Sequence, residues 1–131
     1  WEYHKYIWDN CYNDGDLFIN TSMADAFHIG CIEAMACELP VITTIFGGMT
    51  DYISQNEGWF IDKGDYINWS KELIYEDIKW FKPNIKQIRQ LMRHCYNNKK
   101  EVKEKACNAF KKSKYFRWLD TAKKIKKIIN S

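Results

Sequence analysis

The spacing of apolar residues divides the chain into a β-rich first half and a helical second half. Short β-branched or aromatic runs, typical of buried strands, occur at residues 17–20, 41–44 and 59–61. Between the first two runs, residues 29–37 place helix-forming and apolar side chains at helical spacing, and Pro40 ends that helix. We therefore predict an α/β fold with three parallel strands in one sheet, flanked by helices and joined at first by a right-handed crossover.

The rest of the chain reads mainly as helix. Residues 1–12 fit an amphipathic helix, with Tyr3, Ile7 and Cys11 on one face, and residues 49–55 fit a short helix. Residues 62–65 read as a loop that ends in a helix N-cap. Beyond it we predict helices marked by Trp69, Leu73 and Trp80 up to Pro83, and then by the apolar residues of segments 85–95, 102–110 and 119–129. With no repeat or linker, residues 1–131 are expected to form a single domain.

Composition places the chain among globular proteins. It has 131 residues, of which 46% are hydrophobic, enough for a core, and it has no apolar run of membrane-spanning length. The first residues do not resemble a signal peptide. The five cysteines form no C-x-x-C pair, which favours free thiols in a reducing cytosol, with Cys31 and Cys37 in the core. We therefore expect a cytoplasmic protein.

Positive charge is concentrated at the C-terminal end. From Lys99 onward there are 12 basic and 3 acidic residues, a net charge of +9, whereas the preceding residues carry −6. The basic helices could make a peripheral contact with an anionic membrane surface. We favour a solvated helix face, because the lysines at 123, 124, 126 and 127 lie opposite the apolar stripe. Nucleic acid is not an expected partner, because the sequence contains no recognition module.

The chemistry of interest lies in the loop from Asn20 to Gly30, at the carboxyl end of the first strand. Ligands of parallel sheets bind at that edge, and the N–H groups that begin a helix suit a diphosphate. Asp25 and Glu33 stand on either side of this helix start, with seven residues between them. Carboxylates accept hydrogen bonds from the vicinal hydroxyls of sugars, so the arrangement favours a nucleotide-sugar site. From these residues alone, solvated acids on an ordinary crossover stay a strong alternative.

The exact string from Asp25 to Ile42 resembles the signature of the group 1 retaining glycosyltransferases, family 4, of GT-B fold. Their pattern is approximately S-x-x-E-G-F-G-x-x-x-x-E-A-M-A-C-G-x-P-V-I. Ten positions match it: Ser22, Phe27, Glu33, Ala34, Met35, Ala36, Cys37, Pro40, Val41 and Ile42. Three segments downstream also resemble the family, in the same order: Gly47-Gly48-Met-Thr-Asp51, Gly58-Trp-Phe-Ile and Phe116-Arg-Trp118. The chain departs from the family at Asp25, which replaces glutamate, at Ala26 and His28, which replace glycines, and at Thr21, which replaces a common proline.

The resemblance implies a Rossmann-like, donor-binding C-terminal domain of which residues 1–131 are a part. The missing N-terminal GT-B domain would be a partner and would hold the acceptor, whose identity is unknown. The resemblance assigns the donor sugar to Asp25, the catalytic candidate, and the sugar and diphosphate to the backbone of the segment from Phe27 to Gly30. Glu33 would bind the ribose. The expected substrate site therefore consists of Glu33 and of that loop, with Ala26, His28 and Ile29 included.

The family resemblance implies transfer of a glycosyl unit from a nucleotide-diphosphate sugar with retained configuration, and no metal cofactor. His4 and His94 stand apart from other ligand residues, so the sequence predicts no metal site. His28 in the loop could touch phosphate or sugar, or be structural. The alternative function is a non-catalytic α/β module with a degenerate donor site, acting in protein or membrane-surface interaction.

Overall fold

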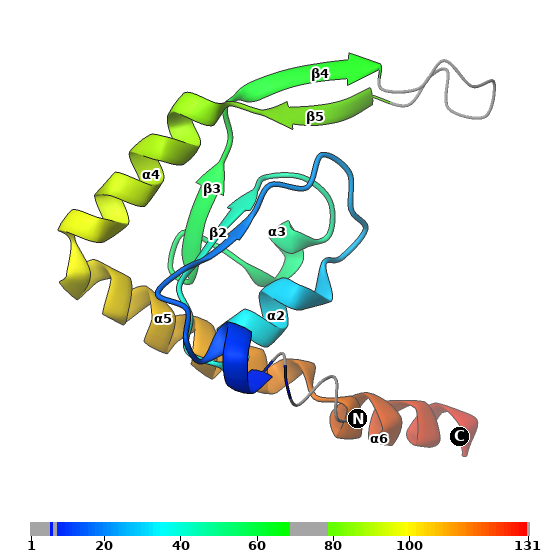
Figure 1. Cartoon of the computed structure of the whole chain (residues 1–131). Helices are drawn as coiled ribbons and strands as arrows, with labels where there is room; N and C mark the ends of the chain where they lie inside the picture. The colour runs from blue at the N-terminus through cyan, green and yellow to red at the C-terminus, as the bar shows by residue number, and fades with distance from the viewer. Residues whose placement is uncertain (1–5, 7, 69–78, 131) are drawn as a thin grey trace.

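A sheet of three parallel strands forms the centre of the molecule (Figure 1). The computed structural model describes residue 6 and residues 8–68 and 79–130. The strands are β1 (Phe18–Asn20), β2 (Val41–Thr44) and β3 (Gly58–Ile61), with β2 in the middle. Phe18 pairs with Val41, and Ile42 pairs with Trp59, both in parallel register. The predicted parallel sheet is confirmed, with strand ends that differ by one residue at most from the predicted ranges.

The alternation of side chains along β2 divides the core between the two faces of the sheet. Val41 packs with helix α2 (Ile29–Ala36) and helix α3 (Met49–Tyr52), whereas Ile42 faces helix α4 (Ile85–Asn97). All four residues of β2 are buried, as expected of a central strand. Cys31 is fully buried in the first cluster, where burial raises the pKa of its thiol to about 11. Cys37 is only partly buried, and none of the five cysteines is in a disulfide.

The C-terminal helices lie close to their predicted ranges. Helix α4 is followed by α5 (Lys99–Ser113), by a short 3₁₀ turn η3 (Lys114–Phe116) and by α6 (Trp118–Ile129). Asn84 caps α4, because its side chain accepts hydrogen bonds from the backbone N–H groups of Lys86 and Gln87. Helix α3 is shorter than the predicted segment 49–55, since the backbone at Ile53 is already extended.

Residues 62 and 63 are loop, as predicted, but the prediction for residues 64–83 is wrong where the structure describes them. Residues Gly64–Asn68 form strand β4 and residues Lys79–Pro83 form strand β5, an antiparallel pair separate from the main sheet. Asp65 is therefore a strand residue and no helix N-cap, and Trp80 lies on a strand. The predicted helix at Trp69 and Leu73 falls on residues 69–78, outside the described residues.

Tertiary contacts explain why β4 and β5 form strands. Phe81 is buried and packs edge-on against Tyr66 of β4, with ring centroids 5.6 Å apart. The Phe81 N–H donates to the Met23 carbonyl at 2.9 Å, which ties β5 to the loop after β1. Aromatic and β-branched residues such as Tyr66, Ile67 and Phe81 favour a strand when such a partner exists. Of the three residues that marked the predicted helix, only Trp80 is among the described residues, and it lies on β5.

The N-terminal prediction has a different outcome for different residues. Only residue 6 and the π-type turn η1 (Trp8–Tyr12) are described in this region, so Tyr3 and Ile7 fall outside the described residues. Cys11, expected on the apolar face, is exposed, whereas Tyr12 is 8% exposed and belongs to the core. A π-type turn advances the chain by more residues per turn than an α-helix does. The buried position therefore moves from Cys11 to Tyr12.

Helix α2 ends in a tight left-handed turn at Glu38. The Leu39 N–H donates to the Ala34 carbonyl at 3.0 Å, and the Glu38 N–H donates to the Met35 carbonyl at 3.2 Å. This is the Schellman pattern, whose left-handed position is usually glycine. Glu38 occupies that position at φ 58°. The resulting backbone strain is about 1–2 kcal/mol, and Leu39, buried beside Tyr12 and Met35, is the apolar residue that this turn returns to the core.

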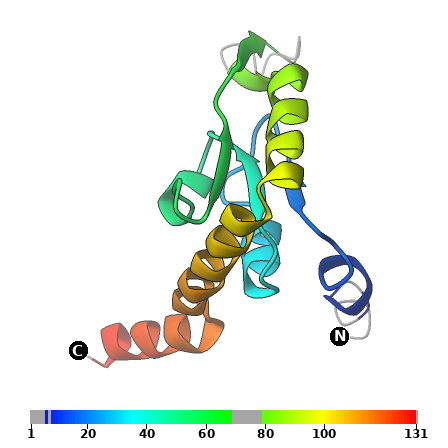
Figure 2. The same cartoon turned by 90° about the vertical axis from the view of Figure 1, so that its left-hand side faces the viewer.

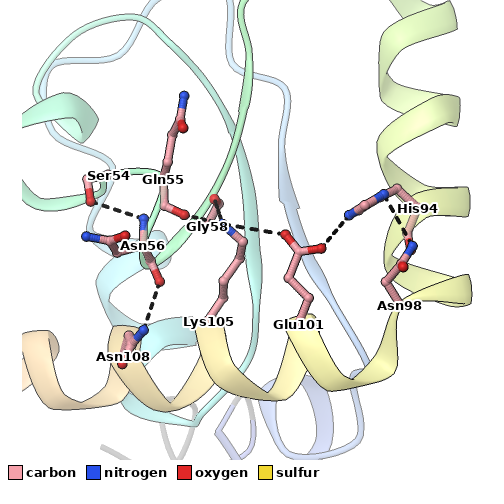
Figure 3. A network of polar contacts seen from close by, with 9 residues as sticks. All are labelled: Ser54, Gln55, Asn56, Gly58, His94, Asn98, Glu101, Lys105 and Asn108. Atoms are coloured by element: carbon pink, nitrogen blue, oxygen red, sulfur yellow. Dashed lines mark hydrogen bonds and ion pairs between the residues drawn. The ribbon is translucent and has the colours of Figure 1, made fainter.

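A network of polar contacts joins α4 and α5 to the loop before β3 (Figure 3). Lys105 donates to the carbonyls of Gln55 and Gly58 and lies 3.8 Å from Glu101. Glu101 in turn lies 2.7 Å from Nε2 of His94, and the hydrogen bond with His94 lowers the pKa of the Glu101 carboxyl. The network fixes the start of β3 against α5, so the position of the sheet depends on the C-terminal helices.

Helix α6 extends away from the rest of the fold (Figures 1 and 2). No residue of α6 is buried, and its large apolar side chains are Trp118, Leu119, Ile125, Ile128 and Ile129. Trp118 is 81% exposed and Ile129 is 77% exposed. No helix among the described residues combines the length and the apolar character that crossing a membrane requires.

Candidate functional site

The loop between β1 and α2 is anchored at its start by side chains on β1 and β2. Asn20, which is 3% exposed at the end of β1, accepts a hydrogen bond from the Ser22 N–H and donates one to Thr43 Oγ1, both at 3.0 Å. Thr44 Oγ1 donates to the Ser22 carbonyl at 3.0 Å. Three buried polar side chains therefore hold the loop at the carboxyl edge of the sheet, where ligands of parallel sheets bind.

The carboxylate of Asp25 closes the second part of the loop. Its Oδ1 accepts hydrogen bonds from the N–H of Phe27 at 3.0 Å and from the N–H of His28 at 2.9 Å. These two amides, expected to face a ligand, therefore already have an acceptor. The N–H groups of Ile29 and Gly30 come next, and no described residue accepts a hydrogen bond from them. Asp25 also keeps Oδ2 without a hydrogen bond to a described residue.

His28, the N-cap residue directly before α2, has a left-handed backbone conformation, with φ 51°. The family pattern has glycine at this position, where such a conformation carries little strain. The Tyr52 hydroxyl of α3 lies 2.7 Å from the Phe27 carbonyl and 2.9 Å from the His28 carbonyl, and stabilises the turn. Tyr52 is fully buried, and this burial raises the pKa of its hydroxyl, so the hydroxyl keeps its proton. His28 therefore replaces the glycine of the family, but its backbone keeps the left-handed conformation that glycine favours.

The turn after β2 packs directly against the same loop. The Gly48 N–H donates to the Ala26 carbonyl at 2.7 Å. A Cβ atom at Gly48 would lie 2.3 Å from that oxygen, and a Cβ at Gly47 would lie 2.1 Å from the Asp25 carbonyl oxygen. Side chains at these positions would push the loop away. The two glycines therefore determine how close the signature loop lies to the edge of the sheet.

Glu33 lies on the second turn of α2, on a different side of the site from Asp25. Its Oε2 accepts a hydrogen bond from the hydroxyl of Tyr12 at 2.9 Å. The two acids have different hydrogen-bond partners: Asp25 holds the backbone before α2, and Glu33, on the helix itself, is held by Tyr12. Ala26, Phe27 and Ile29 are exposed, and the Phe27 ring packs on Tyr52 at 4.9 Å between centroids.

A cavity of about 530 Å³ lies between α2 and the junction of α5 with α6. Glu33, Phe27 and Ile29 form part of one wall. Phe116, Arg117 and Trp118, which resemble a family triplet, form part of the other. The fold thus brings the C-terminal triplet next to α2. The sequence alone does not indicate this proximity.

Three residues that support the site escaped the sequence analysis: Tyr12, Asn20 as an anchor, and Tyr52. Each carries a polar group on a residue that the fold buries, and burial of such a group without a partner is costly. That rule indicates that each has a hydrogen-bond partner, but not which one. For metals, no group of three or more His, Cys, Asp or Glu residues in the described part of the chain could hold an ion.

Comparison with known proteins agrees with the geometry. Residues 2–78, more than half of the chain, match the family model described as "Glycosyl transferases group 1". A segment of 42 residues is 38% identical to one subunit of the phosphatidylinositol N-acetylglucosaminyltransferase of Homo sapiens, and covers 32% of this chain and 9% of that protein.

Solved structures resemble the fold over nearly the whole chain. Sucrose-phosphate synthase from Thermosynechococcus elongatus superposes with a TM-score of 0.75 at 17% identity, covering 97% of this chain and 27% of that one. Anabaena HepE in complex with UDP-glucose superposes with a TM-score of 0.74 at 17% identity, covering 98% of this chain and 36% of that one. The chain therefore spans about a third or less of the length of each of these proteins.

Proposed function

The chain belongs to the group 1 glycosyl transferases, and from this we propose that it binds the nucleotide-sugar donor for a retaining glycosyl transfer. The observation that carries the proposal is the placement of Asp25 and Glu33. Asp25 lies in the loop that leads into α2 and Glu33 on the second turn of α2, and that loop follows β1 at the carboxyl edge of a parallel sheet. HepE, a protein of the same fold, binds UDP-glucose, which supports a donor of this chemical class.

In this proposal each group has a separate task. Asp25 contacts the donor sugar through Oδ2, while its Oδ1 holds the turn. The N–H groups of Ile29 and Gly30, at the positive end of α2, bind the diphosphate. Glu33 accepts hydrogen bonds from the ribose hydroxyls. Ala26, Phe27 and His28 complete the wall of the site beside the sugar.

The reaction exchanges one bond at the anomeric carbon of the sugar. The bond to the diphosphate oxygen breaks, a bond to an acceptor hydroxyl oxygen forms on the same face, and the hydroxyl proton passes to the leaving diphosphate or to solvent. The nucleoside diphosphate leaves. We propose that a second GT-B half, outside residues 1–131, holds the acceptor, and that no metal cofactor takes part.

The first prediction separates donor binding from transfer. The full-length gene product is expected to convert a UDP- or GDP-sugar, with the product's anomeric configuration retained when followed by NMR. Purified residues 1–131 are expected to transfer no sugar, because catalysis needs donor and acceptor held together. Transfer by residues 1–131 would contradict the need for a second half. Failure of the full-length protein to bind any UDP or GDP compound would contradict the proposed function.

A second candidate function is a non-catalytic module that contacts an anionic membrane surface through its basic helices. The exposed α6 favours it, because its apolar residues lie opposite Lys123 and Lys127. On this view residues 1–131 should sediment with vesicles containing phosphatidylserine and not with neutral ones. Replacing Ile125 and Ile129 by serine should at least halve the bound fraction. No sedimentation of the unsubstituted chain would exclude the membrane surface as a partner.

A further inference from the structure

The hydroxyl of Tyr12 lies against the face of α2 that carries the proposed ribose acceptor. It donates to Glu33 Oε2 at 2.9 Å. A Cβ atom at Gly30 would lie 3.5 Å from the same hydroxyl oxygen and 3.2 Å from Cε1 of His28. Gly30 and Glu33 are three residues apart, so they share one helix face. The Tyr12 hydroxyl therefore lies between the first turn of α2 and the Glu33 carboxylate.

Tyr12 is held firmly enough to determine where that carboxylate points. Its side chain is 8% exposed and belongs to the core cluster of α2, β2 and α3. Its ring packs against Phe18 of β1, with centroids 5.9 Å apart. Burial raises the pKa of the Tyr12 hydroxyl, and the hydrogen bond to Glu33 raises it further, so the hydroxyl stays a donor. A rigid donor fixes the Glu33 rotamer, whereas a glutamate side chain in water samples several.

The hydrogen bond also leaves Glu33 free to bind a ligand. A carboxylate has about four acceptor positions on its two oxygens. Tyr12 takes one position on Oε2, and no described residue donates to Oε1. Two neighbouring hydroxyls need both oxygens in one orientation, which a fixed carboxylate plane provides.

From these contacts we propose that Tyr12 is a positioning residue that orients Glu33 toward the ribose 2′- and 3′-hydroxyls of the donor. The inference rests on the proposed function and adds to it a residue from outside the signature string. Tyr12 does not touch the nucleotide itself. Its effect on binding passes through Glu33, and that distinguishes it from a residue whose loss merely loosens the fold.

The test is a double-mutant cycle on nucleotide binding by the full-length gene product. Calorimetry with UDP, GDP and ADP identifies the nucleotide that binds best, and the 2′,3′-dideoxy form of that nucleotide serves as the second probe. Tyr12→Phe is expected to weaken binding of the ribonucleotide about fivefold, in the range of one hydrogen bond. It is expected to leave binding of the dideoxy form unchanged. In a Glu33→Ala background, which has no carboxylate for Tyr12 to orient, Tyr12→Phe is expected to have no further effect.

The outcomes separate the two proposals. If no nucleotide binds the wild type, or Glu33→Gln binds as well as the wild type, the ribose assignment and the Tyr12 inference both fail. If Glu33→Gln weakens binding but Tyr12→Phe does not, the Tyr12 inference alone fails. It also fails if Tyr12→Phe weakens both probes equally, or weakens binding equally in the Glu33→Ala background, because either result indicates a structural role. Tyr66→Phe, at an exposed position on β4, is the matched control and should bind as the wild type does.

Discussion

Replacing Glu33 by glutamine is expected to weaken binding of the nucleoside diphosphate to the full-length gene product at least tenfold, about 1.4 kcal/mol. Glutamine keeps the shape of the side chain and an oxygen for the Tyr12 hydroxyl, but it loses the charge. Hydrogen bonds to a charged group contribute about 1.5–3 kcal/mol each, so two ribose hydroxyls make the charge important. Isothermal calorimetry with the nucleotide that binds the wild type measures the change.

The competing explanation for Glu33 is a small electrostatic effect on the helix. The interaction of an acid with a helix N-terminus falls off within the first turn, and Glu33 is on the second turn of α2. The melting temperature of Glu33→Gln should therefore change little. Glu38→Gln, an exposed acid five residues further along, is the matched control and should leave affinity unchanged. Wild-type affinity in Glu33→Gln would remove Glu33 from the site and leave the family relationship as a statement about fold.

Replacing Gly48 by alanine is expected to abolish nucleotide binding and to lower the free energy of unfolding by about 1–3 kcal/mol, the usual cost of overpacking. The added Cβ would lie 2.3 Å from the Ala26 carbonyl oxygen, which is backbone and can move only with the loop. The loop carries Asp25 and leads into the Ile29 and Gly30 amides, so its displacement disrupts the proposed sugar and diphosphate contacts together. Calorimetry and thermal unfolding of the same variant measure both effects.

Gly64→Ala provides the control for a clash of the same size away from the site. A Cβ at Gly64 would lie 2.3 Å from the Lys82 carbonyl oxygen, within the hairpin of β4 and β5. This variant should lose stability and keep its affinity for the nucleotide at temperatures where it is folded. If Gly64→Ala lost affinity as fully as Gly48→Ala, lowered stability alone would explain the loss. The close approach of Gly48 to the loop would then have no specific role in binding.

Local patterns of residues were enough to predict the parallel sheet and the helices that pack on it. Residues 41–44 are β-branched without interruption, as burial on both faces of a sheet requires, and the structure has Val41–Thr44 as its central strand. Ile29–Ala36 begins and ends almost where helix propensity and Pro40 indicated. These elements can be read from local periodicity, because each face of a strand or helix meets either the core or solvent along its whole length. The family signature could also be recognised from the sequence, because it lies on consecutive residues.

The residues that support the candidate site, in contrast, are brought there by contacts between distant segments. Residues 64–68 and 79–83 became strands because Tyr66 pairs with Phe81 and because the Phe81 N–H reaches the Met23 carbonyl. Tyr12 meets Glu33 across 21 positions of sequence, and Tyr52 meets Phe27 across 25. No local pattern specifies such pairs, because a buried hydroxyl requires a partner without indicating which one. The sequence showed where the acids stand, and packing of distant segments determines what holds them there.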